Sequence, residues 1–239
     1  MQEKYKTNQI LNIILVSIFT VGILLSVGQM LSLAFPYLVP PFPTDIDFLE
    51  SKQWVVEKWH WLTAFYIHIS SAIITLAAGL TQFSKAFMKR FPVWHRKIGK
   101  LYVFVVLFVA GPSGFVMAFY GNGGSLAQYA FISQAIAWWW LTYMAYHRII
   151  KGDLKGHCKF MIRSYAMTLS AISLRAATYI VSLWKFNNGI TCPNITYSLI
   201  CYPDFYILIA WLSWVVNLLI AEFLILIGIV NYYLPAKRV

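Results

Sequence analysis

Four polar side chains that could bind a ligand or move a proton fall inside long apolar runs of this sequence. They are His68, Gln134, Arg175 and Asn217. If these runs are membrane-spanning helices, which rise about 1.5 Å per residue, His68 and Arg175 reach similar depth in the outer half of the membrane. A guanidinium at the centre of a bilayer costs at least ~2.5–3.5 kcal/mol, so it should face a partner or a cavity. We therefore expect these residues to line a polar ligand-binding pocket.

Arg175 has no carboxylate at its level, because Glu222 lies five residues beyond Asn217, toward the inner side. An arginine without an acid suits an anionic or strongly accepting group, such as a carboxylate, a phosphate, a quinone carbonyl or a haem propionate. The alternative is a structural arginine that reaches the membrane surface or binds backbone carbonyls. His68 alone is typical of a hydrogen-bonded core residue. Its pairing in depth with Arg175 makes it a candidate for binding or proton transfer.

Three other histidines, His95, His147 and His157, lie at or near the inner ends of the apolar runs, among many basic residues. His95 and His157 occupy equivalent places on two helical hairpins and could ligate a b-type haem, whose propionates the nearby lysines and arginines would hold. All three histidines could instead hold zinc. The plainest interpretation is that His95 and His157 organise loop ends and helix starts. The sequence has no HxxxH, HExxH or CxxCH spacing that would favour a metal.

The composition indicates a chain that lies mostly in lipid. Of its 239 residues, 60% are hydrophobic and 11% are charged, and the mean hydropathy is +0.66. Soluble globular chains carry about 25% charged residues, and a soluble domain of this length could not bury so much apolar surface. We therefore predict an integral protein of the plasma membrane or of a bacterial inner membrane. The net charge of +11 does not indicate nucleic-acid binding, because the basic residues lie in short loops between apolar runs.

Six apolar runs are long enough to cross the membrane, which takes roughly 20 helical residues. If both chain ends are inside, 15 of the 19 lysines and arginines fall in inner segments and three fall in outer segments. The remaining one, Arg175, lies within a predicted span. Because basic residues concentrate in cytoplasmic loops, we predict an all-α transmembrane bundle of six helices. It forms one domain over 1–239 with both termini cytoplasmic, and its inner loops should attract anionic lipid. The predicted spans are 10–35, 59–84, 99–120, 126–147, 160–185 and 205–233.

Two short segments add local constraints to this bundle. Cys192 and Cys201 lie in the last outer loop, where an oxidising environment favours a disulfide over the alternative of two free thiols. Gly111-Pro112 should kink or loosen the third span, because proline removes a backbone hydrogen-bond donor.

Two inner segments share a pattern, which reads HRKIGKLY from His95 and HCKFMIRSY from His157. Each has a histidine, then a lysine two residues later, then an apolar residue, a basic residue and a tyrosine. The pattern predicts that spans two–three and four–five are related hairpins, for example about a pseudo-two-fold axis along the membrane normal. Chance similarity is the alternative, since the second copy is shifted by one residue.

Four motifs carry a resemblance to a known family. They are Gly79-Leu-Thr-Gln82, Trp94-His95-Arg96-x-x-Gly99-Lys100-Leu-Tyr102, Gly152-Asp153 and His157-x-x-x-Met161-Ile-Arg163-Ser164-Tyr165. With these motifs the sequence resembles, over roughly residues 60–185, the domain of unknown function 2306 family of predicted multi-span membrane proteins. The resemblance implies an α-helical membrane protein and no particular activity. Cys158 stands where the family pattern would have a basic residue.

Three functional hypotheses follow from these residues. The first is a membrane oxidoreductase subunit that carries haem b or handles a quinone. The second is a non-enzymatic binder or transporter of an anionic or lipid-like small molecule, with Arg175 as the anchor. The third is a structural subunit of a membrane complex. A hydrolase or an ATP-driven pump is disfavoured, because the sequence has no P-loop, no serine-hydrolase elbow and no paired acids.

Overall fold

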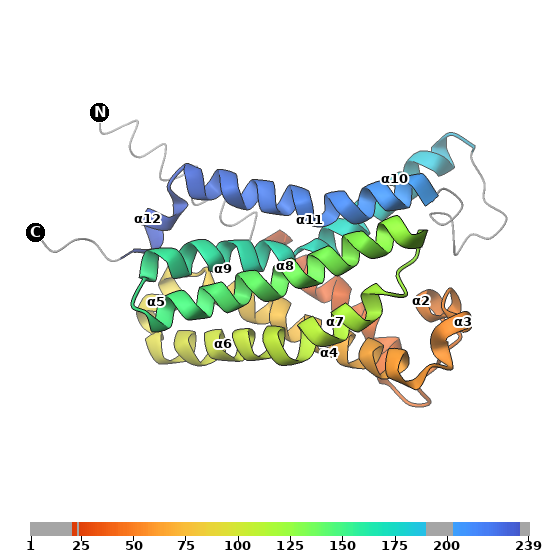
Figure 1. The fold of residues 1–239 in the computed structure, drawn as a ribbon, viewed down its shortest axis with the longest axis horizontal. Coiled ribbons are helices and arrows are strands. Elements are labelled where there is room, and N and C mark those ends of the chain that lie inside the picture. Colours follow the sequence, from red (N-terminus) through yellow and green to blue (C-terminus); the bar gives the residue numbers. More distant parts are fainter. Residues whose placement is uncertain (1–20, 23, 190–202, 235–239) are drawn as a thin grey trace, which may run out of the picture.

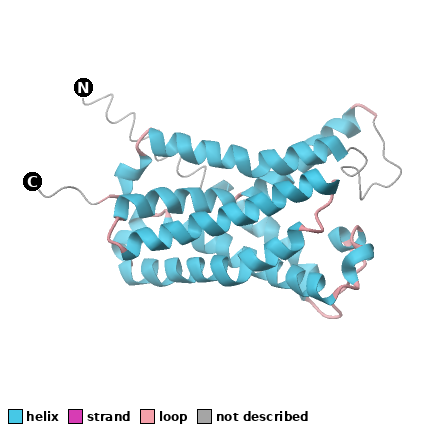
Figure 2. Cartoon of the chain, viewed as in Figure 1, coloured by secondary structure: helices cyan, strands magenta, loops and turns pink. Residues whose placement is uncertain are grey.

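The computed structural model describes residues 21, 22, 24–189 and 203–234. Every regular element in those ranges is a helix, so the all-α prediction is confirmed for them (Figures 1 and 2). The elements are the helix Leu24–Leu38, α2 (Asp47–Glu50), α3 (Gln53–Val56), α4 (Trp59–Gln82), α5 (Lys85–Arg90), α6 (Pro92–Val105), the π-helix η1 (Val106–Ala110), α7 (Gly111–Ala118), α8 (Gly124–Ile150), α9 (Leu154–Thr168), α10 (Ser170–Asn187), α11 (Pro203–Leu226) and α12 (Ile229–Tyr233).

Four helical segments in the described ranges are long and apolar enough to cross a membrane: Trp59–Gln82, Pro92–Ala118, Leu154–Lys185 and Phe205–Leu226. The protein is therefore a multi-span membrane protein. The predicted fourth span corresponds to α8, whose 27 residues cover roughly 40 Å, although its tryptophan, tyrosine and glutamine residues lower its mean hydropathy. The six-helix count, the cytoplasmic termini and the pseudo-repeat stay predictions.

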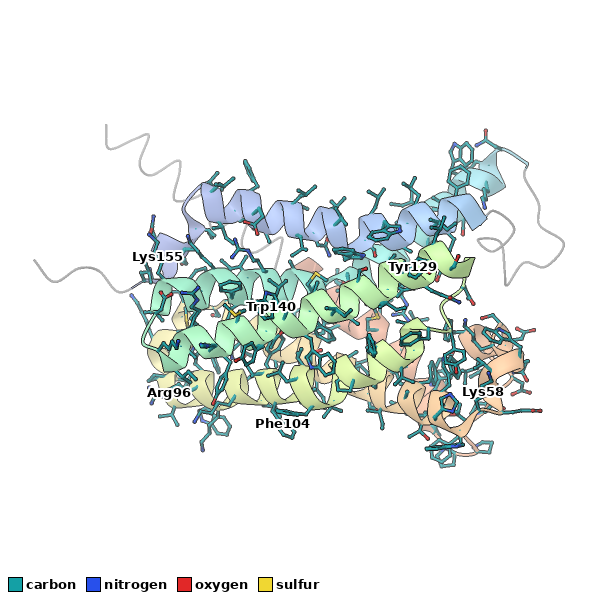
Figure 3. The ribbon with its side chains drawn as sticks, viewed as in Figure 1. Lys58, Arg96, Phe104, Tyr129, Trp140 and Lys155 are labelled. Carbon is teal, nitrogen blue, oxygen red and sulfur yellow. The ribbon has the colours of Figure 1, made fainter. Side chains whose placement is uncertain are left out.

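The helices form an elongated bundle with two distinct ends (Figure 1). At one end lie α5, the start of α6 and the turn between α8 and α9, which carry most of the lysines and arginines; we call it the basic end. The short helices α2 and α3 cover the opposite end, which we call the capped end. Figure 3 shows Arg96 and Lys155 at the basic end and Lys58 at the capped end.

The core lies along α8 and α9, which run through the middle of the bundle between α6 and α11. Tyr102, Trp138, Met161, Tyr165 and Met167 are its large buried residues. Because α8 and α9 contact helices on both sides, side chains on them can hold the other spans in register.

Local sequence sets the starts of α6 and α9 at the basic end. Pro92 is the first residue of α6, where a missing N–H is harmless and the fixed backbone favours a helix. Asp153 caps α9 by accepting a hydrogen bond from Gly156 N at 2.8 Å. Gly152, before that cap, has φ +77°, a conformation that glycine adopts without strain. These starts make His95 and His157 each the fourth residue of its helix.

The third span contains the irregularity predicted at Gly111-Pro112. It takes the form of a π-helical turn, η1, between α6 and α7. Pro112 has no N–H to give to the carbonyl of Leu107, five residues earlier. The indole Nε1–H of Trp139 donates to that carbonyl instead, at 2.7 Å. The span therefore stays continuous although its hydrogen-bond ladder is interrupted.

Candidate functional site

His95 and His157 lie on facing sides of α6 and α9 near the basic end. Seven residues after each histidine come Tyr102 and Ser164, whose hydroxyl oxygens are 2.9 Å apart. Residues seven apart share a helix face, so this hydrogen bond shows that the faces carrying the histidines oppose each other. The two rings are close enough for a charge on His157 to act on His95. The two histidines thus lie on helix faces that oppose each other, while the repeat that would relate their hairpins stays a prediction.

Each of these imidazoles has a ring nitrogen without a hydrogen-bond partner among the described residues. His157 Nδ1 is 2.8 Å from the carbonyl oxygen of Ala145. Since a carbonyl only accepts, Nδ1 carries the proton, and the neutral ring presents Nε2 as a lone pair. His95 Nδ1 is buried and makes no hydrogen bond to any described residue. Each of the two helices thus carries one imidazole nitrogen that is available to bind a ligand.

A network of buried hydroxyl groups lies two turns further into the bundle. Tyr102 Oη is 2.8 Å from Thr168 Oγ1 as well as 2.9 Å from Ser164 Oγ, and Ser164 Oγ is 2.6 Å from Thr142 Oγ1. The network joins α6, α8 and α9. This network was not predicted as a site from the sequence, although Tyr102 and Ser164 belong to the family motifs.

The motif glycines have packing roles in the same region. A Cβ atom on Gly79 would overlap the ring of Tyr165. That ring lies across α4 and donates its hydroxyl to the carbonyl of Leu76 at 3.1 Å. A Cβ on Gly99 would lie 2.8 Å from Oε1 of Gln82. The family motifs on α4, α6 and α9 therefore meet in one half of the bundle.

An ion pair that the sequence analysis missed joins α9 to α11. Arg163 donates through Nε and Nη2 to the two carboxylate oxygens of Glu222, with Nη2–Oε2 at 2.8 Å. No partner for either residue was predicted from the sequence. The structure places Arg163 inside α9, facing α11. The two residues lie at comparable depth on two predicted spans, and this match of an acid with an arginine could have indicated the ion pair.

His68 and Arg175 lie toward the middle and the capped end. His68 Nδ1 is 3.0 Å from the carbonyl of Ala110 at the end of η1, and its ring packs against Gly114. Arg175 donates to the sulfur of Met30. The guanidinium is near enough for its charge to act on His68, but no hydrogen bond joins these two side chains. Their shared pocket stays a prediction.

Gln134 and Asn217 make hydrogen bonds between helices around the break at Leu169, which separates α9 from α10. Gln134 donates to Ser170 Oγ at 2.5 Å. Asn217 donates to the carbonyl of Ala166 at 3.1 Å and accepts from Ser173 at 3.0 Å. These contacts hold α8 and α11 against the broken span, and a ligand-binding role for either residue stays a prediction.

The zinc alternative gains no support within the described ranges, where no three His, Cys, Asp or Glu side chains gather closely enough to hold a metal ion. The ring of His147 instead lies 5.8 Å from that of Tyr143. The expected disulfide of Cys192 and Cys201 lies outside the described residues.

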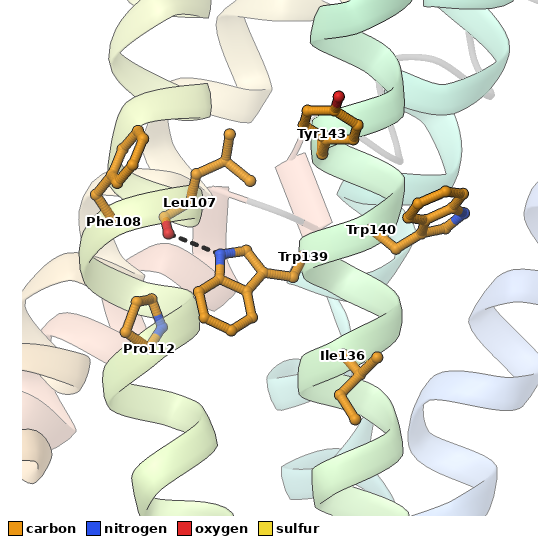
Figure 4. Close-up of a pocket in the computed structure, with 7 residues that line it drawn as sticks. All are labelled: Leu107, Phe108, Pro112, Ile136, Trp139, Trp140 and Tyr143. Atoms are coloured by element: carbon orange, nitrogen blue, oxygen red, sulfur yellow. Dashed lines mark hydrogen bonds between the residues drawn. The ribbon is translucent and has the colours of Figure 1, made fainter.

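A shallow groove of about 570 Å³ opens on the side of the bundle between η1 and α8. Trp139 crosses its floor to reach the Leu107 carbonyl, and Tyr143 lies at one end (Figure 4). Its walls are almost wholly apolar, so it suits hydrocarbon contact better than polar recognition. Its lining is Leu107, Phe108, Pro112, Ile136, Trp139, Trp140 and Tyr143.

Comparison with protein families gives a match over most of the bundle. The family described as "Predicted membrane protein (DUF2306)" matches residues 65–225, which include the opposed histidines, the hydroxyl network and the Arg163–Glu222 pair. Neither the curated proteins nor the solved structures gave a match. Because the matched segment is more than half of the chain, the protein belongs to the DUF2306 family of predicted membrane proteins.

Proposed function

We propose that this protein is a b-type haem protein of the membrane, in which His95 and His157 would hold the haem, and that it acts as a subunit of a membrane oxidoreductase. The observation that carries the proposal is the placement of two imidazoles on opposed faces of α6 and α9, each with an unpaired ring nitrogen. Bound haem would supply one-electron redox chemistry.

The surroundings of the two histidines fit residues that hold a haem. Histidines that bind metal usually donate their second nitrogen to a backbone carbonyl or a carboxylate, which fixes the tautomer; His157 does so to Ala145. A buried ring nitrogen without a partner costs roughly 1–3 kcal/mol, and coordination by His95 would remove that penalty. Arg96, Lys100 and Lys159 lie at the same end and offer cations for propionate groups.

An absorbance spectrum tests this proposal. The full chain, produced with a haem precursor and purified in mild detergent, should show a Soret band that shifts on reduction with dithionite. His95→Ala and His157→Ala should each lose the band while they elute as folded protein. His147→Ala is the matched control at the same end and should keep it. A folded, colourless wild-type protein, or equal loss of the band in His147→Ala, overturns the proposal.

A second candidate function, favoured by Arg175, is the binding of an anionic amphiphile. Arg175 makes no ion pair within the described ranges. His68 uses Nδ1–H on Ala110, so its Nε2 is an acceptor. A ligand between the two would offer oxygen acceptors to Arg175 and a donor to His68, as a protonated or partly protonated acid does.

Equilibrium binding of palmitate tests the second candidate. The wild-type protein should bind it, and Arg175→Met should lose binding without loss of the folded bundle. Arg148→Met, which removes an exposed arginine at the basic end, is the control and should bind as the wild type does. Full palmitate affinity in Arg175→Met removes this candidate and leaves the haem proposal untouched.

A further inference from the structure

The corner between α5 and α6 gathers positive charge that no described residue neutralises. Residues 85–100 contain six basic residues and no acidic one. No ion pair among the described residues involves them. Five of the six are exposed: Lys89, Arg90, Arg96, Lys97 and Lys100.

The other turn at the basic end, between α8 and α9, has a different charge balance. Arg148 pairs with Asp153 at 3.2 Å, and Arg163, further along α9, pairs with Glu222. Of its basic residues only Lys151, Lys155 and Lys159 remain outside an ion pair within the described ranges. The unneutralised charge of the basic end is therefore concentrated on the α5–α6 corner.

Large apolar side chains are exposed on the same corner. Phe91, Val93 and Trp94 have exposed fractions of 43%, 51% and 57%. The ammonium of Lys97 lies 5.3 Å from the Trp94 ring, and the guanidinium of Arg90 lies 5.4 Å from the Phe91 ring. Exposed aromatic rings beside cations are typical of the membrane–water interface. α4 ends and α6 begins at this corner. Two membrane spans therefore reach the membrane–water interface there.

We propose that the α5–α6 corner binds the headgroup of an anionic phospholipid, with Lys89, Arg90 and Lys97 on the phosphate and Phe91 and Trp94 at the acyl boundary. The charge selects anionic lipid over zwitterionic lipid. The exposed rings select a lipid over a free phosphate, because only a lipid covers them. The site goes beyond the haem proposal and uses none of its ligands.

Lipid titration of the detergent-solubilised full chain, followed by native mass spectrometry, tests this site. The two lipids are phosphatidylglycerol and phosphatidylcholine with identical acyl chains. The wild type should bind phosphatidylglycerol at least tenfold more tightly. A basic residue near the surface contributes about fivefold, so Lys89→Gln/Arg90→Gln/Lys97→Gln should weaken phosphatidylglycerol at least tenfold and leave phosphatidylcholine unchanged.

The matched control is Lys151→Gln/Lys155→Gln/Lys159→Gln, which removes the same charge from the other turn. Because those lysines lie outside the proposed site and their effect on it is screened by salt, phosphatidylglycerol affinity should fall much less than in the first triple variant. Phe91→Ser/Trp94→Ser should weaken both lipids. Equal weakening by the two triple variants, equal wild-type affinity for the two lipids, or displacement of the lipid by an equal concentration of glycerol phosphate overturns the proposal.

Discussion

The two ends of the bundle are held together by different kinds of contact. Toward the basic end, side chains of α6, α8 and α9 hydrogen-bond directly with one another, as Tyr102 does with Ser164, and the Tyr165 ring packs on Gly79. Toward the capped end, the hydrogen bonds of side chains go mainly to backbone carbonyls, as that of His68 does to Ala110. Contacts between side chains depend on the identity of both partners, whereas a carbonyl is present whatever the residue. The first region should therefore tolerate substitution less than the second.

Replacement of Gly79 gives the largest expected effect. In Gly79→Val, the new side chain would overlap the Tyr165 ring, which must then leave α4 and lose its bond to Leu76. Overpacking of this kind costs about 1–3 kcal/mol or more, and the lost hydrogen bond adds about 1 kcal/mol. Unfolding in mixed detergent micelles measures the loss. Gly28→Val is the control, because a Cβ there meets no described residue within 4 Å. Equal stability of the two variants would contradict the comparison.

The Arg163–Glu222 pair tests whether charge also fixes the packing of α9 on α11. Glu222→Leu leaves the Arg163 guanidinium in the membrane without its partner and should destabilise the fold by about 2 kcal/mol. Breaking a fully buried ion pair typically costs about 3–5 kcal/mol. We expect a smaller loss here because the Glu222 side chain is 44% exposed. Arg163→Met/Glu222→Leu should recover at least half of that loss in the same assay. A double variant as unstable as the single one would show that the pair is not the cause.

The hydroxyl network gives a smaller effect. Tyr102→Phe removes hydrogen bonds to Ser164 and Thr168, each of which keeps another partner. We expect a loss of about 1–2 kcal/mol. Tyr66→Phe removes a hydroxyl that reaches only the Phe42 carbonyl, at 3.5 Å, and should cost under about 0.5 kcal/mol. If both variants lost the same free energy of unfolding, the proposed difference between the two ends of the bundle would be contradicted.

Lys52 provides a pH test at the capped end. Its ammonium donates to the carbonyl of Tyr120 and is 1% exposed, and burial lowers its pKa from 10.5 to about 8. Between pH 8 and pH 10.5, Lys52 binds more protons in the unfolded chain than in the folded one. Raising the pH in this range therefore increases the free energy of unfolding. The gain from pH 7.5 to 9 is about 1 kcal/mol.

Lys52→Met should remove that pH dependence, and the measurement is the difference in unfolding free energy between wild type and variant at the two pH values. Lys58→Met, which removes an exposed lysine at the same end, is the control and should keep the slope. An unchanged slope in Lys52→Met would mean that the ammonium does not titrate in this range.

Most spans could be predicted from the sequence because apolar runs mark them directly. The prediction 59–84 compares with Trp59–Gln82, and 205–233 with Phe205–Leu226. The predicted starts of the third and fifth spans, at residues 99 and 160, lie about two turns after the observed helix starts at Pro92 and Leu154, because basic residues such as Arg96 and Lys97 are typical of loops. Long basic side chains can lie within a helix and still reach the membrane surface.

The site could be predicted only in part. Periodicity and the repeated pattern indicated that His95 and His157 are equivalent. An apolar run does not indicate how its helix is rotated about its own axis relative to a neighbouring helix. The partners of Arg163 and Asn217 could therefore not be predicted from the sequence. The break at Leu169 has no proline or glycine beside it, and nothing in the sequence marks it.

The π-helical turn at Val106–Ala110 also sets how the third span can change in length. Such a turn holds one residue more than an α-helical turn. Deleting one residue there would convert the π-turn into an ordinary α-helical turn, and the helix beyond it would keep nearly the same orientation. Gly114, which lies against the ring of His68, would then still face that ring. Elsewhere in the span, where the helix is regular, a deletion would rotate everything beyond it by about 100°.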